Sequence, residues 1–335
     1  MSAERPSGNR ALSAVTDRRY NGAMFFDEEK VRSLLRMEDL IPAMANALRD
    51  LSAGKVEQPL RLVLPVAEHK GFFGVMPASG GALGAKLVTF YPNNQGIPTH
   101  HAMILLFRPE TGEPLVTMDG RLITEMRTAA VSAVATDLLS RREVGVLALL
   151  GSGVQAQSHL EALRIVRQFR EVRVWSPRRA GEFAKQFGVI AVASAEEAVR
   201  GADVIVVATS ATKPVLKGEW LSPGAHINAV GATRPNWREL DDEALRQARI
   251  YVESREAATK ESGDIIAAGK IFAELGEVVA GSKAGRESDE EITLYKSVGV
   301  AVEDIVAASL VYRRATVGTS SRVLAGEDSR NKPSC

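Results

Sequence analysis

A glycine-rich turn between an apolar strand and a helix constrains the fold of this chain more than any other feature. The apolar run at residues 144–150 leads directly into the sequence GSGVQA, which starts at Gly151, and a helical pattern follows over residues 155–168. The next apolar run, VRVW, comes where a second parallel strand is expected. Glycines allow a tight turn and a close approach of the backbone to a pyrophosphate, which binds at the positive N-terminus of the helix. The segment therefore predicts a Rossmann-type dinucleotide-binding unit.

The residues after this second strand favour NADP(H) over NAD(H). Units that bind NAD usually place an acidic side chain there, which holds the ribose hydroxyls. This chain has Ser176, Arg178 and Arg179 instead. A hydroxyl and two guanidinium groups would donate hydrogen bonds to a 2′-phosphate, which a carboxylate would repel. The alternative is that both arginines are solvated side chains at the start of a helix.

The pattern of secondary structure changes near residue 143 and indicates two domains. Before this point we expect one helix, four short strands and an alanine-rich helix. Their ranges are 27–51 for the first helix, 61–65, 86–91, 102–107 and 115–119 for the strands, and 122–140 for the alanine-rich helix. After this point strands alternate with helices, which is typical of a parallel sheet covered on both faces.

The predicted fold class is therefore α/β, with a Rossmann-type doubly wound parallel sheet and a discontinuous α+β domain. A last helix is expected over residues 293–315, and it would return to the first domain. The predicted boundaries are residues 1–127 with 300–335 for the α+β domain and 128–299 for the Rossmann domain.

Charge and composition argue against several classes of protein. With 42 basic and 41 acidic residues the net charge is +1, which argues against a nucleic-acid partner. Cys335 is the only cysteine, so no intramolecular disulfide is expected, and the five histidines lack the spacing of a metal site. No apolar run reaches the roughly 18 residues of a membrane-spanning helix, and residues 1–22 lack the apolar core of a secretory signal. We therefore expect a cytoplasmic protein without a metal or a membrane anchor, and no chemistry in the polar ends at residues 1–22 and 318–335.

Three basic residues of the first domain suggest a pocket for an anion such as a carboxylate. Lys86 lies in an apolar strand, Arg127 lies in the alanine-rich helix, and Arg61 comes shortly after a Gln-Pro pair. Burying such cations without an anionic partner would be costly, which favours an anion beside them. The alternative is that each of the three residues is a surface charge. Trp237 follows a parallel strand, where open α/β sheets bind ligands, and the alternative is that it is a core residue.

Several longer segments resemble the ornithine cyclodeaminase/mu-crystallin family. They include LGAKLVTFYP, MRTAAVSAVAT, GSGVQAQSHLEAL, GADVIVVAT and GEWLSPGAHINAVGA, and the resemblance extends over residues 27–315. The segments EQPLRLVLPV, GVMPAS, RPNWRELDDE and KESGDI are most similar to the mu-crystallin branch, whose enzymatic activity is NAD(P)H-dependent ketimine reduction. The resemblance implies a homodimer, in which the first domain supplies the dimer sheet and part of the substrate site.

The resemblance also implies the site residues. Arg61, Lys86 and Arg127 match residues that bind the substrate carboxylate, and Glu261 in KESGD matches an active-site glutamate. The residues expected at the substrate are Arg61, Lys86, Phe90, Arg127, Thr233 and Trp237, and those expected to be catalytic are Lys86, Arg127 and Glu261. The residues expected at NADPH, with NADH as the alternative cofactor, are Gly151, Gly153, Val154, Gln155, Ser176, Arg178, Arg179, Thr209, Val230 and Gly231.

Thr233 distinguishes between the branches of the family. In ornithine cyclodeaminases the strand that matches HINAVG is followed by an aspartate that acts on the substrate amine or the nucleophile, whereas this chain has Thr233. Without that carboxylate, cyclodeamination lacks its base. The expected function is NAD(P)H-dependent reduction of cyclic ketimine carboxylates, of the pyrroline-2-carboxylate or piperideine-2-carboxylate type, to cyclic amino acids. The alternatives are an ornithine or lysine cyclodeaminase, an alanine-type amino-acid dehydrogenase, and an NADPH-regulated protein that binds a small ligand such as thyroid hormone.

Overall fold

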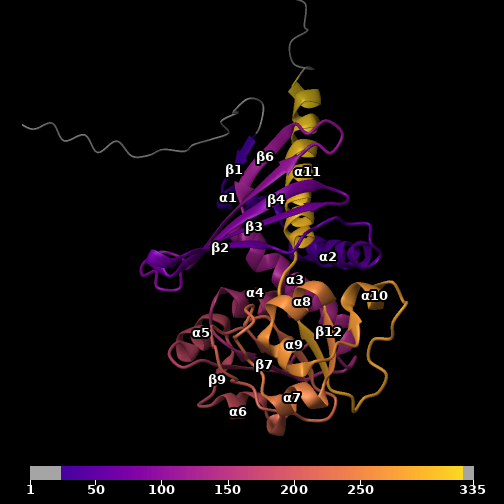
Figure 1. Cartoon of the computed structure of the whole chain (residues 1–335). Coiled ribbons are helices and arrows are strands. Elements are labelled where there is room, and N and C mark those ends of the chain that lie inside the picture. The colour runs from indigo at the N-terminus through magenta and orange to yellow at the C-terminus, as the bar shows by residue number, and fades with distance from the viewer. Residues whose placement is uncertain (1–23, 327–335) are drawn as a thin grey trace, which may run out of the picture.

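The chain forms two domains, each built around its own β-sheet (Figure 1). The computed structural model describes the backbone of residues 24–326 and the side chains of residues 24–317. The two polar ends expected from the sequence therefore lie outside the described side chains, although the last helix continues to Gly326.

The first domain is a six-stranded sheet, in the order β1-β6-β5-β4-β3-β2, with helices packed on one face. Its strands are β1 (Met24–Phe26), β2 (Leu62–Val66), β3 (Gly71–Ser79), β4 (Leu83–Phe90), β5 (His100–Phe107) and β6 (Pro114–Asp119). Its helices are α1 (Glu28–Leu34), α2 (Met37–Ser52), α3 (Arg121–Leu139) and α11 (Ala301–Gly326), with a short 3-10 turn, η1 (Ala67–His69). Side chains alternate between the two faces of each strand, so Met76 and Ile104 are buried under the helices while Leu62 and Met103 point outward and are exposed.

The second domain is an eight-stranded parallel sheet in the order β13-β12-β14-β11-β10-β7-β8-β9. Its strands are β7 (Val146–Leu150), β8 (Glu171–Trp175), β9 (Ile190–Ala191), β10 (Val204–Val207), β11 (His226–Ala229), β12 (Arg249–Val252), β13 (Ala273–Glu274) and β14 (Thr293–Lys296). Its helices are α4 (Val154–Val166), α5 (Ala180–Phe187), α6 (Ala195–Val199), α7 (Asp242–Gln247), α8 (Arg255–Glu261), α9 (Gly263–Ala268) and α10 (Leu275–Val279), with the 3-10 turn η2 (Gly218–Trp220).

Both faces of this parallel sheet are covered. Leu147 and Leu149 of β7 belong to one apolar cluster, whereas their neighbours Ala148 and Leu150 belong to another on the opposite face. A strand covered on both faces has a continuous apolar sequence, which explains the run VLALL. The predicted Rossmann-type, doubly wound fold is confirmed.

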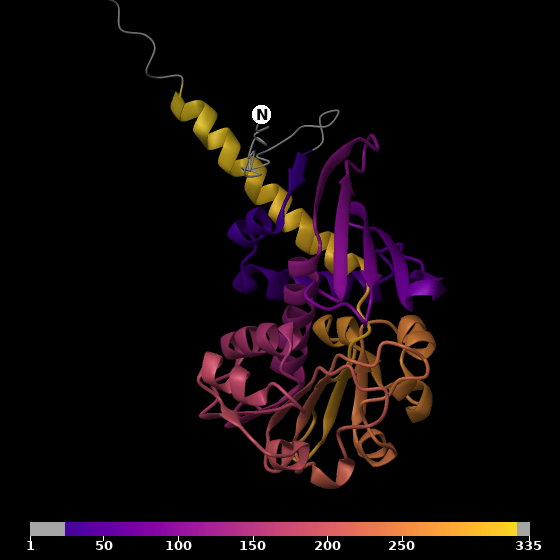
Figure 2. The same ribbon diagram turned by 90° about the vertical axis from the view of Figure 1, so that its left-hand side faces the viewer.

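The chain passes between the domains twice. Helix α3 makes the first connection (Figure 2). Its small residues, such as Ala130 and Ala133, are fully buried. Residues 297–300 make the second connection, from β14 to α11, and α11 packs on α2, α3 and the sheet of the first domain. The first domain is therefore built from two separate parts of the chain, as expected.

Several elements differ from the sequence prediction. The expected helix over residues 293–315 is wrong in its first part, because Thr293–Lys296 is strand β14 in the middle of the parallel sheet and the helix begins only at Ala301. Since both faces of β14 are buried, its side chains show no alternation that would identify a strand. The expected helix over residues 27–51 is two helices, α1 and α2, and strand β3 was not predicted.

In the described part of the chain, none of the helices is long and apolar enough to cross a membrane. The His, Cys, Asp and Glu side chains of this part also form no group of three that could hold a metal ion.

Candidate functional site

The turn between β7 and α4 has the geometry of a phosphate-binding loop. Gly151 has a φ of +116°, and a Cβ atom there would clash with the carbonyl oxygen of Ala208, so only glycine fits. Gly153 is the N-cap of α4 and has open space where a Cβ would lie, and no side chain caps the helix. The amide groups of the first turn therefore lie at an uncovered helix N-terminus, which suits a pyrophosphate. Among the described residues, the buried Oε1 atom of Gln155 also has no hydrogen-bond partner.

The end of β8 brings the expected 2′-phosphate residues to the same loop. The hydroxyl oxygens of Ser152 and Ser176 are 2.8 Å apart, and the backbone amide of Arg179 donates to the Ser176 hydroxyl over 3.2 Å. The side chains of Arg178 and Arg179 are exposed, and Nε of Arg179 lies 3.4 Å from the Glu182 carboxylate. Both guanidinium groups are thus accessible to a phosphate group at the end of β8.

Buried charges fix the loops that follow β10 and β11. The amide and hydroxyl of Thr209 donate to Oε1 of Glu239 over 2.8 and 2.6 Å, and Nζ of Lys296 donates to the carbonyl oxygen of Gly231. Lys296 also lies 3.5 Å from the carboxylate of Asp264. Burial raises the pKa of Glu239 to about 7, against the opposing effect of Lys296. The expected cofactor residues Thr209 and Gly231 are therefore held by a buried charge cluster that was not predicted from the sequence.

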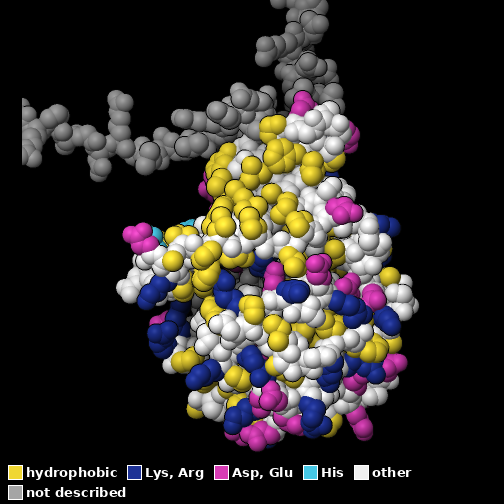
Figure 3. Space-filling model, in the orientation of Figure 1, with side chains coloured by type: hydrophobic (Ala, Val, Ile, Leu, Met, Phe, Trp, Pro, Cys, Tyr) yellow, Lys and Arg dark blue, Asp and Glu magenta, His cyan; other side chains and the backbone are white. Residues whose placement is uncertain are grey.

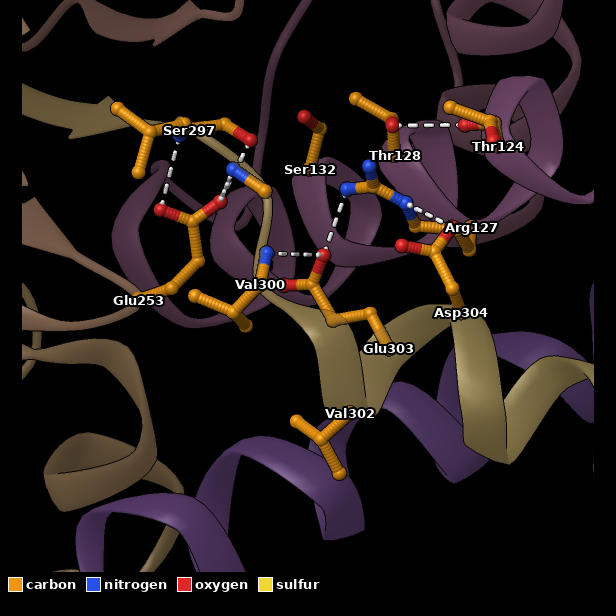
Figure 4. Close-up of polar contacts among 12 residues, drawn as sticks. Thr124, Arg127, Thr128, Ser132, Glu253, Ser297, Val300, Val302, Glu303 and Asp304 are labelled. Atoms are coloured by element: carbon orange, nitrogen blue, oxygen red, sulfur yellow. Dashed lines mark hydrogen bonds and ion pairs between the residues drawn. The ribbon is translucent and has the colours of Figure 1, made fainter. Parts of the chain in front are cut away.

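Two of the expected substrate residues, Lys86 and Arg127, form a buried cluster with two carboxylates of α11. Nζ of Lys86 donates to Asp304 over 2.7 Å, and Nε of Arg127 donates to the same carboxylate over 3.2 Å. Nη1 of Arg127 donates to Glu303 over 2.6 Å, as Figure 4 shows. The four side chains are almost entirely buried. The two cations are therefore paired, but their partners lie 176 to 218 residues away in sequence.

Burial changes the proton affinity of this cluster. It lowers the pKa of Lys86 to about 8, although the neighbouring Asp304 acts in the opposite direction. Burial likewise raises the pKa of Glu303, with Arg127 opposing it, and lowers the pKa of the nearby His100 to about 4. Lys86 can therefore both hold and release a proton near neutral pH, whereas His100 remains uncharged.

Arg61 connects the two domains. Its Nε atom lies 2.8 Å from the Glu261 carboxylate at the end of α8, and its Nη2 atom donates to the carbonyl oxygens of Val298 and Gly299 over 2.5 and 2.7 Å. The same connecting segment is held from the other side by Glu253, which accepts hydrogen bonds from Ser297, Val298 and Gly299 (Figure 4). Burial raises the pKa of Glu261, so this carboxyl holds a proton more readily than an exposed glutamate.

The remaining expected substrate residues lie around the same boundary between the domains. Phe90 pairs directly with Phe72 across strands β4 and β3. Thr233 and Trp237 are half-buried in the loop after β11, and this loop also carries Arg234, whose guanidinium group stacks on Phe72. Trp237 is therefore not a fully buried core residue.

Five residues near these side chains were not predicted from the sequence: Arg234, Phe72, Glu239, Glu303 and Asp304. The sequence offered one signal for the last two, because Glu303 and Asp304 are adjacent carboxylates inside the helix that was expected to return to the first domain. Arg234 stands beside Thr233, directly after a parallel strand, where a ligand-binding residue is expected.

The model of the ornithine cyclodeaminase/mu-crystallin family matches residues 22–319, which is most of the chain. The chain belongs to this family. Within the family it is similar to the mouse ketimine reductase mu-crystallin, with 53% identity over 302 residues that cover 86% of this chain and 96% of the mouse protein.

Two solved structures are also similar to this chain. One is the Thermococcus litoralis Δ1-pyrroline-2-carboxylate reductase in complex with NADH and L-proline, with 40% identity, a TM-score of 0.84, and coverage of 88% of this chain and 98% of that protein. The other is an archaeal alanine dehydrogenase dimer with bound NAD, with 38% identity, a TM-score of 0.84, and coverage of 89% and 97%.

Proposed function

We propose that this protein reduces cyclic ketimine carboxylates to cyclic amino acids, with NAD(P)H as the reductant. The observation that carries this proposal is the position of the basic residues at the boundary between the domains. Lys86 and Arg127 on one side, and the ion pair of Arg61 with Glu261 across the boundary, surround the end of the sheet where open α/β folds bind their ligands. Basic and acidic groups together suit a substrate that carries both a carboxylate and a protonated imine.

Each of these residues has a specific role in the proposal. Arg61 and Arg127 bind the substrate carboxylate, for which each charge-assisted hydrogen bond contributes about 1.5–3 kcal/mol. Lys86 lies beside the imine and polarises the C=N bond. Glu261, whose pKa is raised by burial, keeps the imine nitrogen protonated, because an iminium accepts a hydride far better than a neutral imine. Phe90 and Trp237 form the walls of the site.

The residues around the β7–α4 turn fit a dinucleotide. Gly151, Gly153, Val154 and Gln155 would hold the pyrophosphate at the start of α4, and Thr209, Val230 and Gly231 would hold the nicotinamide half. Ser176, Arg178 and Arg179 would bind the 2′-phosphate, so we propose that NADPH is preferred over NADH. The cofactor, when bound, supplies the hydride.

Thr233 favours reduction over cyclodeamination. A hydroxyl without an activating base cannot act as a general base at neutral pH, whereas a carboxylate can. Among the described residues, no hydrogen bond of the Thr233 side chain provides such activation. We therefore propose that the protein does not release ammonia from ornithine or lysine.

We also propose that the protein is a cytoplasmic homodimer that pairs through the outer face of the first sheet. This face carries exposed apolar side chains from several strands, among them Leu62 (57% exposed), Leu64 (49%), Met103 (45%) and Phe25 (43%). Figure 3 shows hydrophobic side chains gathered over this domain, whereas charged side chains are spread over the second domain. An apolar face of this kind is typical of an interface.

Steady-state kinetics with several substrate classes test the proposed reaction. The purified protein should oxidise NADPH in the presence of pyrroline-2-carboxylate or piperideine-2-carboxylate and form the cyclic amino acid. It should show much lower activity with pyruvate plus ammonia, and no ammonia release from ornithine or lysine with catalytic NAD(P)+. Faster turnover of pyruvate, or ammonia release at a comparable rate, would replace this proposal with the dehydrogenase or the cyclodeaminase. Tight binding of thyroid hormone without turnover of any imine would favour a binding protein.

A further inference from the structure

Three charged side chains lie fully buried behind the loops that follow β10 and β11. They are Glu239, Asp264 and Lys296, and none of them is accessible to solvent. Oδ1 of Asp264 accepts hydrogen bonds from the backbone amides of Glu239 and Leu240 over 3.1 and 3.2 Å. The carbonyl oxygen of Glu239 accepts a further hydrogen bond from the amide of Leu216 over 3.0 Å. The backbone that carries the Glu239 side chain is therefore fixed on both sides.

The carboxylate of Glu239 contacts both loops at once. Its Oε1 atom accepts hydrogen bonds from the amide and the hydroxyl of Thr209, in the loop after β10. In the loop after β11, a Cβ atom at Gly231 would lie 2.4 Å from the same Oε1 atom. The φ of Gly231 lies outside the left-handed region. It is therefore the Glu239 carboxylate, rather than the backbone conformation, that requires a glycine at this position.

The polar groups of the two loops already have partners within the protein. The Thr209 hydroxyl donates to Glu239 and accepts from the amide of Ala211 over 3.0 Å. The carbonyl oxygen of Gly231 accepts from Lys296, and the next residue, Ala232, has a φ of +52°. A residue other than glycine keeps such a left-handed conformation only where its surroundings fix it. The two loops therefore have a defined shape, which the buried charges maintain.

A carboxyl group is a costly side chain for this buried position. Among the described residues, the Oε2 atom of Glu239 has no hydrogen-bond partner, and burial raises the pKa of this carboxyl to about 7, with Lys296 opposing the rise. A neutral side chain would avoid the desolvation of a charge. However, a charged acceptor forms stronger hydrogen bonds than a neutral one. The carboxylate therefore holds Thr209 more firmly than an amide in the same place would.

We propose that Glu239 is a positioning residue for the nicotinamide half of the cofactor, because its carboxylate fixes the loops of Thr209 and Gly231 that receive this half. The inference rests on the proposed function, which assigns both loops to the nicotinamide. It adds that Thr209 and Gly231 contribute the position of their backbone rather than free hydrogen-bonding groups. The residue that sets this position is 30 residues away from Thr209 in sequence.

Two ligands that differ only in the nicotinamide test this inference. One is NADPH, and the other is 2′-phospho-ADP-ribose, which keeps the 2′-phosphate, the pyrophosphate and both riboses. Isothermal titration calorimetry on the full chain measures the two Kd values. Glu239→Ala should raise the Kd of NADPH at least tenfold, which corresponds to about 1.4 kcal/mol, and should change the Kd of 2′-phospho-ADP-ribose less than twofold. Glu239→Gln keeps the shape and a neutral acceptor, so it should raise the Kd of NADPH by only about threefold.

The contact between Glu239 and Gly231 allows a second, independent test. Gly231→Ala alone should raise the Kd of NADPH at least tenfold, because the added methyl group displaces the Glu239 carboxylate. In the Glu239→Ala background the same methyl group no longer meets this carboxylate, so Gly231→Ala should add less than a twofold change. Fully additive losses in the double variant would show that the two residues do not act through their contact, and would overturn the inference.

Glu219→Ala serves as the control, because Glu219 is an exposed glutamate of η2 that pairs with Lys217. It should leave both Kd values unchanged. An equal loss of both ligands in Glu239→Ala would show that Glu239 only stabilises the domain, and an unchanged Kd of NADPH would show that the loops do not depend on it. Either result overturns the inference while the proposed function stands. If Glu239→Ala does not fold, Glu239→Gln decides by the same comparison. If the unmodified protein binds neither ligand, it is the proposed function that fails.

Discussion

Lys86 is almost fully buried, and its charge depends on one carboxylate. Asp304 accepts a hydrogen bond from Lys86 over 2.7 Å, while Arg127 and Arg61 both act to lower the pKa of the lysine. An ammonium group held near its point of deprotonation can polarise a C=N bond strongly, because it shares its proton more readily than an ordinary lysine. This property could not be predicted from the sequence. Lys86 itself stood out as a cation within an apolar strand, but the partner that keeps it charged is 218 residues away.

The pKa of Lys86 gives a prediction for the pH dependence of the reaction. The protonated lysine is the active form in our proposal, so kcat/KM should fall by about tenfold per pH unit above about 8, since kcat/KM reports the groups of the free enzyme. Asp304→Asn removes a negative charge that raises the pKa of Lys86, so the fall should begin at lower pH. Glu196→Gln, in an exposed pair with Arg200, should leave the profile unchanged. If Asp304→Asn and the unmodified protein show the same pH dependence of kcat/KM, the protonation of Lys86 does not control the reaction.

Arg178 and Arg179 give a second prediction at this scale. Replacing both by alanine should remove most of the preference for NADPH and barely change the kinetics with NADH, because only the 2′-phosphate needs their charges. The measurement is the ratio of kcat/KM for the two cofactors. If the double variant keeps the original ratio, the 2′-phosphate is bound by other residues.

At the scale of elements, local patterns could be predicted and partnerships between distant elements could not. The β7–turn–α4 unit was predictable because strand, glycine turn and helix are contiguous and each depends on its own residues. Strand β14 was not predictable, because a short strand that is buried on both faces shows no alternation of apolar and polar residues. The acidic start of α11 likewise falls inside the range of one long expected helix, although Glu303 and Asp304 both pair with Arg127.

The two glycines of the β7–α4 turn should respond differently to alanine. Gly153 has a φ of −90° and open space around its Cβ position, so Gly153→Ala should change Tm by less than about 2 °C but weaken NADPH binding at least tenfold, because the methyl group would meet the pyrophosphate. Gly151→Ala should lower Tm by about 4 °C or more, since its φ of +116° and its contact with Ala208 both exclude a side chain. Thermal melts and fluorescence titration of NADPH measure both effects. Equal NADPH affinity in Gly153→Ala and the unmodified protein would place the pyrophosphate elsewhere.

At the scale of the whole molecule, the outer face of the first sheet makes the oligomeric state testable. Replacing Leu62 and Leu64 together by glutamate should convert a dimer into a monomer of 36.0 kDa in analytical ultracentrifugation, because two buried charges at an apolar interface are costly. Ile190→Glu is the matched control, because Ile190 is an equally exposed apolar residue (51%) in β9 of the second domain. This variant should remain a dimer.

The domain boundary drawn between residues 127 and 128 stays a prediction, and it falls inside helix α3.

The return of α11 to the first domain also affects the order in which the chain can fold. During synthesis, Lys86 and Arg127 leave the ribosome long before Glu303 and Asp304, from which they are separated by 218 and 176 residues. Until those carboxylates emerge, the two cations have no partners and must remain in water, and the inner face of the first sheet lacks one of its covering helices. The parallel sheet of the second domain needs no residue beyond Lys296 and can form earlier. The domain that is made first is therefore the one that is completed last.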